Sequence, residues 1–283
     1  MQVIPKIIHY CWFGGKPLPD LAIKCIESWK KYCSGYEIKE WNESNFDLSA
    51  CKYISEAYAE KKWAFVSDYA RFWILYREGG IYFDTDVELI SPIDDLLKKG
   101  AFMACESMLA SRSTLAINPG LGLAASPELG LYKEILNFYH KKSFYRENGT
   151  LDLTTVVMIV TAIMKAHGWK QRFEVQCIEN IYIYPPEYFC PKDHWTGEVT
   201  ITENTRAIHH YSESWVSVEA QRINRVMRVL IHRFGEKQGY RIWCIYAFPY
   251  RFKRKLRNVG MKGMVMFIIK KLFRNKNIVE ENY

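Results

Sequence analysis

The chain has 283 residues, 49% hydrophobic and 25% charged, which indicates a globular protein with a substantial core. Its net charge is +8, and the positive charge lies in residues 222–283, which hold 16 Lys or Arg against 3 Asp or Glu. Charge alone is compatible with nucleic-acid binding, but no recognised module accompanies it, and we expect no nucleic-acid partner.

The eight cysteines form no CxxC pair and have no regular spacing, which indicates neither a zinc module nor a disulfide framework. They fit a reducing cytosol. The chain begins with a strand-like IPKIIHYCWF instead of a charged and then apolar leader, and no uncharged run reaches about 18 residues. We therefore expect a cytoplasmic protein that is neither secreted nor membrane-spanning.

Residues 3–13 form an apolar run that ends at Gly14–Gly15, which is typical of a buried parallel strand. The loop after such a strand lies where open α/β sheets bind ligands. His9, inside this strand, is expected to be structural. The next predicted elements are a helix from Asp20, a strand at 36–41 and a helix at 49–60. This alternation favours an α/β domain with a mainly parallel sheet.

Residues 61–88 are the most informative segment. One face of a predicted helix carries five aromatic residues at three- and four-residue steps, and Gly79–Gly80 end it: Phe65, Tyr69, Phe72, Trp73 and Tyr76. From Ile81 the pattern has a period of two, which predicts a strand with Asp84 and Asp86 on the same face.

Two carboxylates held this close repel each other, and a divalent cation with hard oxygen ligands relieves the repulsion. Bound Mg²⁺ or Mn²⁺ is the natural occupant. Asp68 and Arg71, one helical turn apart, add an acceptor and a fixed cation beside it. The alternative interpretation of an isolated Asp-x-Asp is a solvated turn.

The same segment resembles the signature of glycosyltransferase family 32 and its relatives, including the glucosylating domains of large clostridial toxins. It combines Ser-Asp-x-x-Arg at 67–71, Gly-Gly, Tyr82 and Asp-x-Asp. The resemblance implies a nucleotide-sugar transferase with the following roles: Asp86 binds the metal, Asp84 holds the ribose and the sugar or metal, Asp68 and Arg71 grip the donor sugar, and Tyr82 frames the nucleotide.

Other segments match the family in the same order along the chain. IPKIIHYCWFGG matches its opening motif, which implies that Trp12 stacks on the nucleobase; the alternative is a plain core tryptophan. Asn42, after Trp41, is a weaker nucleotide candidate. Strands are predicted at 100–107 and 114–124. Asn118 lies in the second, and the resemblance implies that it makes a polar contact to the donor sugar.

Helices are predicted from Ser126 to His140 and over 153–167. The family often has Thr-Gly-Pro near the start of the second helix, whereas this chain has Asn-Gly-Thr-Leu-Asp at 148–152. This departure leaves the acceptor side of the site open.

Residues 181–195 and 201–215 match the closing motifs of the family. The resemblance implies that a late residue completes the metal and diphosphate site, with His210 the first candidate and His209 the second; imidazole is an acceptable ligand for manganese. Ser214 and Trp215 would cover the diphosphate. The alternative is that the histidine pair is structural.

The basic tail carries an apolar helical stripe over 223–234 and a second basic amphipathic stretch at about 252–273. Such segments suit an anionic membrane surface. A helical cover on the protein's own sheet is the alternative.

Together these patterns predict an A-type, Rossmann-like catalytic domain at 1–216 with a mainly parallel sheet flanked by helices, followed by a basic helical appendage at 217–283. The resemblance implies a metal-dependent, retaining glycosyltransferase whose donor is a UDP-hexose, although GDP-mannose serves some relatives. The acceptor would be a saccharide or a lipid-linked saccharide at the inner membrane face, as in capsule or O-antigen assembly. The alternatives are a saccharide-binding scaffold that keeps the fold, and a phosphohydrolase of the haloacid dehalogenase type.

Overall fold

The computed structural model describes residues 3–107, 114–194, 196–212 and 218–273. The chain divides into two compact units, Met1–Ser217 and Val218–Tyr283. The first contains all the strands of the described residues, and the second contains helix α8 (Val218–Phe273). Among the described helices, none combines the length and the apolar composition needed to cross a membrane.

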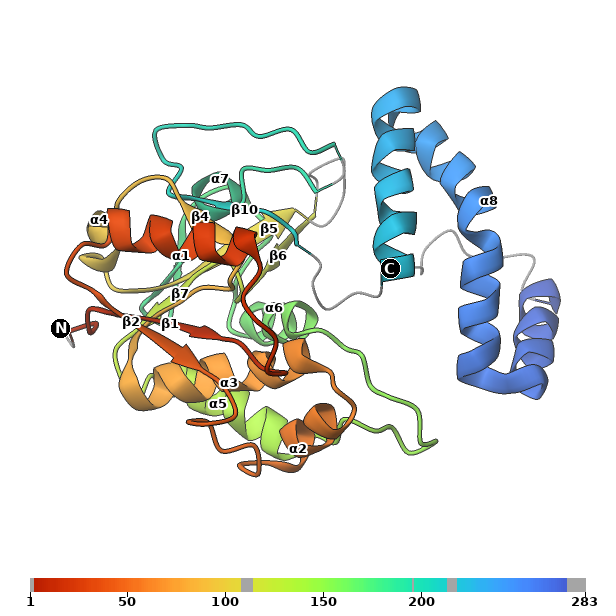
Figure 1. The fold of residues 1–283 in the computed structure, drawn as a ribbon, viewed down its shortest axis with the longest axis horizontal. Coiled ribbons are helices and arrows are strands. Elements are labelled where there is room, and N and C mark those ends of the chain that lie inside the picture. The colour runs from red at the N-terminus through yellow and green to blue at the C-terminus, as the bar shows by residue number, and fades with distance from the viewer. Residues whose placement is uncertain (1–2, 108–113, 195, 213–217, 274–283) are drawn as a thin grey trace. The chain divides into compact units, whose positions relative to one another are not determined.

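The first unit is built on an eight-stranded sheet with helices on both faces (Figure 1). Its strands are β1 (Ile7–Cys11), β2 (Glu37–Trp41), β3 (Gly80–Tyr82), β5 (Ala101–Ser107), β6 (Leu115–Ile117), β7 (Leu123–Ala125), β8 (Gln176–Ile178) and β9 (Ile181–Tyr184). They follow the order β2-β1-β3-β7-β5-β9-β8, with β6 beside β5. The predicted α/β class with helix-flanked layers is confirmed. The sheet is mixed rather than mainly parallel, because β6, β7 and β8 run antiparallel to their neighbours.

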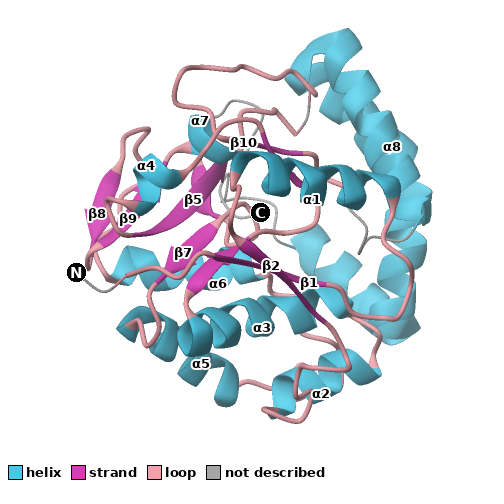
Figure 2. Ribbon diagram, turned by 60° about the vertical axis from the view of Figure 1, so that its left-hand side comes forward, coloured by secondary structure: helices cyan, strands magenta, loops and turns pink. Residues whose placement is uncertain are grey.

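Two hydrophobic cores fill the two faces of this sheet. One face is covered by α1 (Asp20–Tyr32), α4 (Asp94–Leu97) and α7 (Pro186–Phe189), and the other by α2 (Lys52–Ala59), α3 (Trp63–Glu78), α5 (Gly130–His140) and α6 (Val156–Ala166) (Figure 2). The aromatic face predicted for α3 packs into the core between α3 and the sheet, where Tyr69 and Phe72 are buried. Helix α3 ends at Gly79, whose φ of 67° lies in the left-handed region that favours glycine.

A second, two-stranded sheet pairs β4 (Val87–Leu89) with β10 (Ala207–His209) in antiparallel register. His209 lies opposite Val87, so the end of β10 sits beside the residue that follows Asp86. The backbone N–H of His210 donates to the Asp86 carbonyl over 2.9 Å. This ribbon therefore brings a segment more than a hundred residues away against the Asp-x-Asp motif.

His9 is a satisfied structural histidine, as predicted. Its side chain is fully buried in β1, and its Nδ1 accepts a hydrogen bond of 3.1 Å from Trp41 Nε1. The other nitrogen, Nε2, therefore carries the proton and donates to the Gly79 carbonyl over 3.0 Å. Burial lowers the pKa of His9 to about 4, so the ring is neutral in the folded chain at neutral pH.

Acidification is therefore expected to destabilise the protein through His9. Because the folded pKa lies below the unfolded value of 6.5, its contribution is complete above pH 6.5 and is lost as the pH falls toward 4. Between pH 7 and pH 4.5 this loss is about 2 to 3 kcal/mol. Urea unfolding of the wild type and of His9→Gln at both pH values checks it. An equal loss in both proteins would contradict the assignment.

Helix α8 folds back on itself within the second unit. Gly235 has a φ of 75°, which breaks the helical path, and Trp243 Nε1 donates to the Ile223 carbonyl over 3.1 Å. Ile223, Met227 and Ile231 of the predicted apolar stripe are buried. Both tail segments predicted as helices are helical in the structure.

Candidate active site

The Asp-x-Asp motif lies in a loop and turn rather than in a strand. Strand β3 ends at Tyr82 and β4 begins at Val87, so the strand predicted through Asp86 is wrong. After β3, the N–H of Asp84 donates to the Gly120 carbonyl over 2.9 Å, and the N–H of Val87 closes a turn on the Asp84 carbonyl. The two carboxylates therefore do not share a strand face, and each is positioned by a different part of the chain.

Asp86 is held by the segment that follows β10. Its Oδ2 accepts from the backbone N–H of Ser212 over 2.8 Å, and its Oδ1 lies 3.4 Å from His209 Nε2. Burial opposes ionisation of Asp86, but the charge of His209 and the hydrogen bonds from His209 and Ser212 hold the pKa of this carboxyl well below its usual range. Asp86 is thus ionised at every pH near neutrality.

The two candidate histidines face different partners. His209 is buried beside Asp86, which raises the pKa of His209 well above its ordinary value although burial alone lowers it. The ring of His210 instead lies 2.7 Å from Glu88 Oε2, which also pairs with Lys24. Of the pair, the second-ranked His209 is therefore the one beside the motif in this structure.

One connected polar cluster is formed by Asp84, Tyr82, Asp68 and Arg71. The helical spacing of Asp68 and Arg71 predicts that these two lie together. The Tyr82 hydroxyl donates to Asp84 Oδ1 over 3.0 Å, and Arg71 Nη2 lies 3.4 Å from the same oxygen. Arg71 Nη2 also donates to Asp68 Oδ1 over 3.0 Å. Burial raises the pKa of Asp68 to about 7, against the opposing effect of Arg71 and with a smaller contribution from Asp84. The cluster places a buried guanidinium between two carboxyls.

Asn118 lies in the loop that supports Asp84. Its Oδ1 accepts from the Gly120 N–H over 2.8 Å, and its Nδ2 donates to Glu106 Oε2 over 2.9 Å. A β-carbon added to Gly120 would overlap the Asp84 carboxylate. The absence of a side chain at Gly120 is therefore what lets this carboxylate lie against the loop.

We expect Gly120→Ala to impair this site without changing its charge. The added methyl group displaces Asp84 from the position in which it accepts from Tyr82, and a displacement of about 1 Å reduces turnover on the order of 100-fold. Gly130→Ala is the matched control, because a β-carbon added there, at the start of α5, would meet nothing within 4 Å. Equal activity of the two variants would show that the position of Asp84 does not matter.

Trp12 and Asp86 line the same small pocket. Thr85 and Ser212 complete its polar side. Trp12 follows β1, is half-buried, packs against one hydrophobic core, and donates from Nε1 to the Lys16 carbonyl over 2.6 Å. Asn42 is turned to local contacts with Glu40 and Ser44. The remaining candidates, Ser214 and Trp215, lie outside the described residues.

The residues around Asp86 and Asp84 fit a divalent cation. Both supply carboxylate oxygens, the hard ligands that Mg²⁺ and Mn²⁺ prefer, and about a third of the Asp84 side chain is exposed. The imidazole of His209 is a further acceptable donor beside Asp86. Such an ion would neutralise developing negative charge on a ligand bound beside Trp12.

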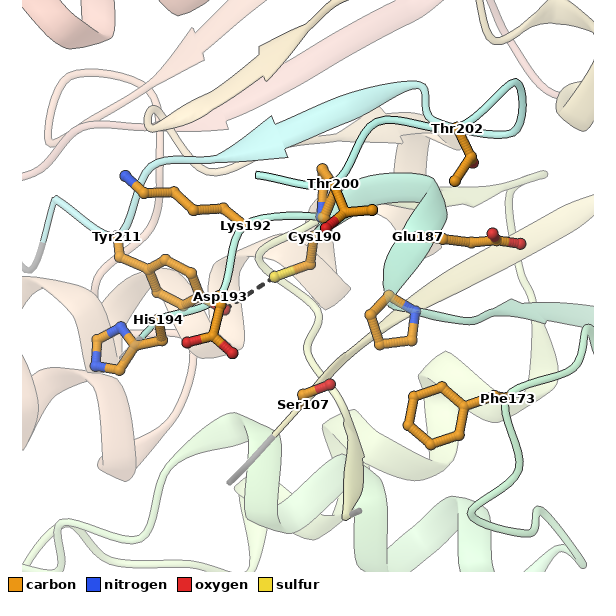
Figure 3. Close-up of a pocket in the computed structure, with 12 residues that line it drawn as sticks. Ser107, Phe173, Glu187, Cys190, Lys192, Asp193, His194, Thr200, Thr202 and Tyr211 are labelled. Carbon is orange, nitrogen blue, oxygen red and sulfur yellow. Dashed lines mark hydrogen bonds between the residues drawn. The ribbon is translucent and has the colours of Figure 1, made fainter. Parts of the chain in front are cut away.

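A larger pocket lies at the ends of β5 and α7 and was not predicted from the sequence (Figure 3). It is lined by Ser107, Phe173, Pro186, Glu187, Cys190, Pro191, Lys192, Asp193, His194, Thr200, Thr202 and Tyr211. The residues that line this pocket come from segments far apart in the sequence, so local patterns do not reveal it. The one local indication is the stretch 181–195, which several prolines interrupt. The rings of Tyr211 and His209 have centroids 4.2 Å apart, which puts this pocket next to the Asp86 side of the site.

Residues 19–103 match a family model described as a glycosyltransferase sugar-binding region containing the DXD motif. This part of the chain is therefore similar to such a region. The match includes Asp68, Arg71, Asp84 and Asp86 and ends before the histidine pair. The resemblance predicted from the sequence is thereby confirmed for this region.

Two curated proteins are similar to part of the chain. Inositol phosphoceramide mannosyltransferase 1 of Schizosaccharomyces pombe is 28% identical over 114 residues, covering 36% of this chain and 34% of that protein. An uncharacterized glycosyltransferase of Acanthamoeba polyphaga mimivirus is 26% identical over 158 residues, covering 54% of this chain and 60% of that protein. The chain thus spans about a third of the first relative and less than two thirds of the second.

Among solved structures, a glycosyltransferase involved in glycosylation of the major capsid of PBCV-1 aligns with 78% of this chain and 99% of its own. The sequence identity is 14% and the TM-score is 0.46.

Proposed function

We propose that this chain is a metal-dependent, retaining glycosyltransferase that moves a hexose from a nucleotide sugar to a saccharide or lipid-linked saccharide. Two observations carry the proposal: Arg71 pairs with Asp84, and Asp86 lines one pocket with Trp12. Asp84, Asp86 and Arg71 all lie within the matched residues. Aromatic stacking, acidic metal ligands and a buried cation are what a sugar attached to a diphosphate needs for binding.

Transfer breaks the bond between the anomeric carbon and a phosphate oxygen, which leaves negative charge on the nucleoside diphosphate. Asp86 and Asp84, with His209 as a further donor, would hold a divalent cation, which would supply Lewis-acid stabilisation of this leaving group. Trp12 binds the base, and the backbone beside Ser212 fixes the Asp86 carboxylate. Asp68 and Arg71 bind hydroxyl groups of the donor sugar and orient it.

The donor is proposed to be a UDP-hexose, on the family resemblance. A curated relative is named as a mannosyltransferase, so GDP-mannose is the second donor to test. The most informative experiment measures sugar release from a panel of UDP- and GDP-sugars with Mn²⁺, Mg²⁺ or a chelator. Metal-dependent release from one donor supports the proposal. Saccharide binding without turnover would favour a scaffold, and hydrolysis of phosphate esters alone would favour a phosphohydrolase.

We also propose that the acceptor is presented at an anionic membrane surface on the cytoplasmic side, as in surface polysaccharide assembly. The support is the excess of basic residues in 222–283, each worth about 1 kcal/mol near anionic headgroups. Co-sedimentation with anionic vesicles is expected for the full chain and not for a chain that ends near Val218. Neutral vesicles are the control, and equal binding by both chains would remove the role of the tail.

A further inference from the structure

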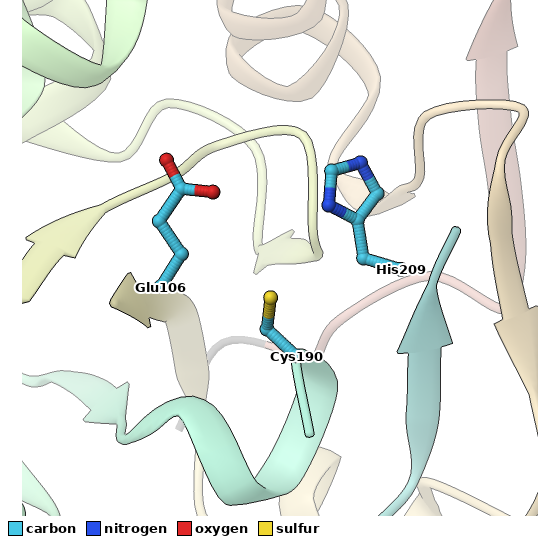
Figure 4. Close-up of side chains that lie close together, drawn as sticks. All are labelled: Glu106, Cys190 and His209. Atoms are coloured by element: carbon cyan, nitrogen blue, oxygen red, sulfur yellow. The ribbon is translucent and has the colours of Figure 1, made fainter. Parts of the chain in front are cut away.

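A second cluster of metal-binding side chains lies beside the proposed donor site. Glu106 is the second-last residue of β5, Cys190 follows α7, and His209 is the last residue of β10. One candidate ligand atom from each lies within 4.8 Å of the other two (Figure 4). Three segments far apart in the sequence therefore converge on one point, with a carboxylate, a thiol and an imidazole.

The orientation of His209 points into this cluster. Its Nε2 faces Asp86, so the opposite ring nitrogen, Nδ1, is the one directed toward Glu106 and Cys190 (Figure 4). This Nδ1 is buried and makes no hydrogen bond of ordinary geometry to a described residue, although the Cys190 thiol beside it interacts with the ring. A buried polar atom without a full hydrogen bond is unfavourable, so a ligand that satisfies it is favoured.

Glu106 and Cys190 are held in place by their own neighbours. Glu106 Oε2 accepts from Asn118 Nδ2 over 2.9 Å, and Cys190 Sγ lies 2.9 Å from the Tyr211 hydroxyl. Burial raises the pKa of Glu106, and the hydrogen bond from Asn118 and the charge of His209 oppose this only in part. Outer contacts of this kind orient the first ligands of protein metal sites.

We propose that Glu106, Cys190 and His209 bind a transition-metal ion, with Zn²⁺ as the natural occupant. Thiolate and imidazole are preferred by Zn²⁺, whereas Mg²⁺ and Mn²⁺ prefer the oxygen ligands of the Asp-x-Asp motif. Tetrahedral ligand atoms around zinc lie about 3.3 to 3.8 Å apart, so the three side chains need to close by about 1.5 Å at most. Binding displaces the protons on Cys190 Sγ and on His209 Nδ1 into solvent.

The site is distinct from the proposed catalytic ion and has a structural consequence for it. With Nδ1 on the zinc, Nε2 carries the remaining ring proton and donates it to Asp86, so His209 then leaves the catalytic ion to Asp84 and Asp86. The ion also fixes β5, α7 and β10 to one another. The sequence did not reveal this site, because its ligands have no CxxC or similar local spacing.

Metal content and Co²⁺ absorption of the untagged full chain test the proposal. After dialysis against a chelator, we expect one Zn²⁺ to be taken up per chain, with proton release. Co²⁺ at the same site is expected to give a thiolate-to-metal charge-transfer band and the visible bands of a tetrahedral ion. Cys190→Ser removes the charge-transfer band, and Glu106→Gln weakens Zn²⁺ binding about tenfold or more.

Two controls keep the sites separate. Cys105→Ser removes the cysteine beside Glu106 in β5 and is expected to keep the band. Asp84→Asn lies in the proposed donor site and is expected to keep Zn²⁺ while losing turnover. A wild-type chain without stoichiometric Zn²⁺, or a charge-transfer band that survives Cys190→Ser, overturns the proposal. Neither result bears on the donor assay, and the wild-type Co²⁺ spectrum remains decisive if a variant fails to fold.

Discussion

Asp86→Asn is expected to lower sugar transfer, or donor hydrolysis, by about 100- to 1000-fold. Asparagine keeps the shape of the side chain and an acceptor for the Ser212 N–H, so the fold of the loop is retained. It removes the negative charge that His209 and Ser212 keep ionised and that a divalent cation requires. The measurement is kcat with saturating donor at several Mn²⁺ concentrations, together with the metal concentration that gives half-maximal rate.

Asp47→Asn is the control for this substitution, because Asp47 is exposed and its carboxylate accepts hydrogen bonds from the neighbouring Ser49. We expect it to retain wild-type turnover. Asp84→Asn should resemble Asp86→Asn if both carboxylates serve the donor site. Full turnover in either active-site variant would refute the catalytic assignment, whatever the metal dependence of the wild type.

Arg71→Met is expected to have the second largest effect, on stability and activity together. The guanidinium is buried between Asp68 and Asp84, and removing one partner of a buried ion pair costs about 3 to 5 kcal/mol. Methionine fills most of the volume, so the cost arises chiefly from the uncompensated carboxyls. Urea unfolding at pH 7.5 measures the stability, and the donor assay measures turnover, which we expect to be nearly lost.

The double variant Arg71→Met with Asp68→Asn separates the two effects. Removing the buried carboxyl relieves the electrostatic cost, so stability should recover by about 2 kcal/mol while turnover stays low. Arg77→Met on the same helix is the control, since Arg77 is exposed and stacks on Trp73. Equal destabilisation by Arg71→Met and Arg77→Met would contradict the buried ion-pair interpretation.

Periodicity predicted the elements that are long and one-sided. Helix α3 follows from the aromatic spacing of Tyr69 and Phe72, and β1 follows from an apolar run that is buried on both faces of the sheet. The same argument failed after Tyr82, where alternation continued but the strand ended. The N–H of Asp84 pairs with the Gly120 carbonyl of a distant loop, and local alternation contains no information about that partner.

The sequence by itself determined the α/β layering, the polar cluster on α3 and the Asp-x-Asp residues, because each depends on side chains that are close in the chain. Only the tertiary structure decided that His209 rather than His210 lies against Asp86, and that Glu106 and Cys190 meet the other side of its ring. Those choices follow from the register of β10 on β4, in which a shift of one residue exchanges the faces of the two histidines.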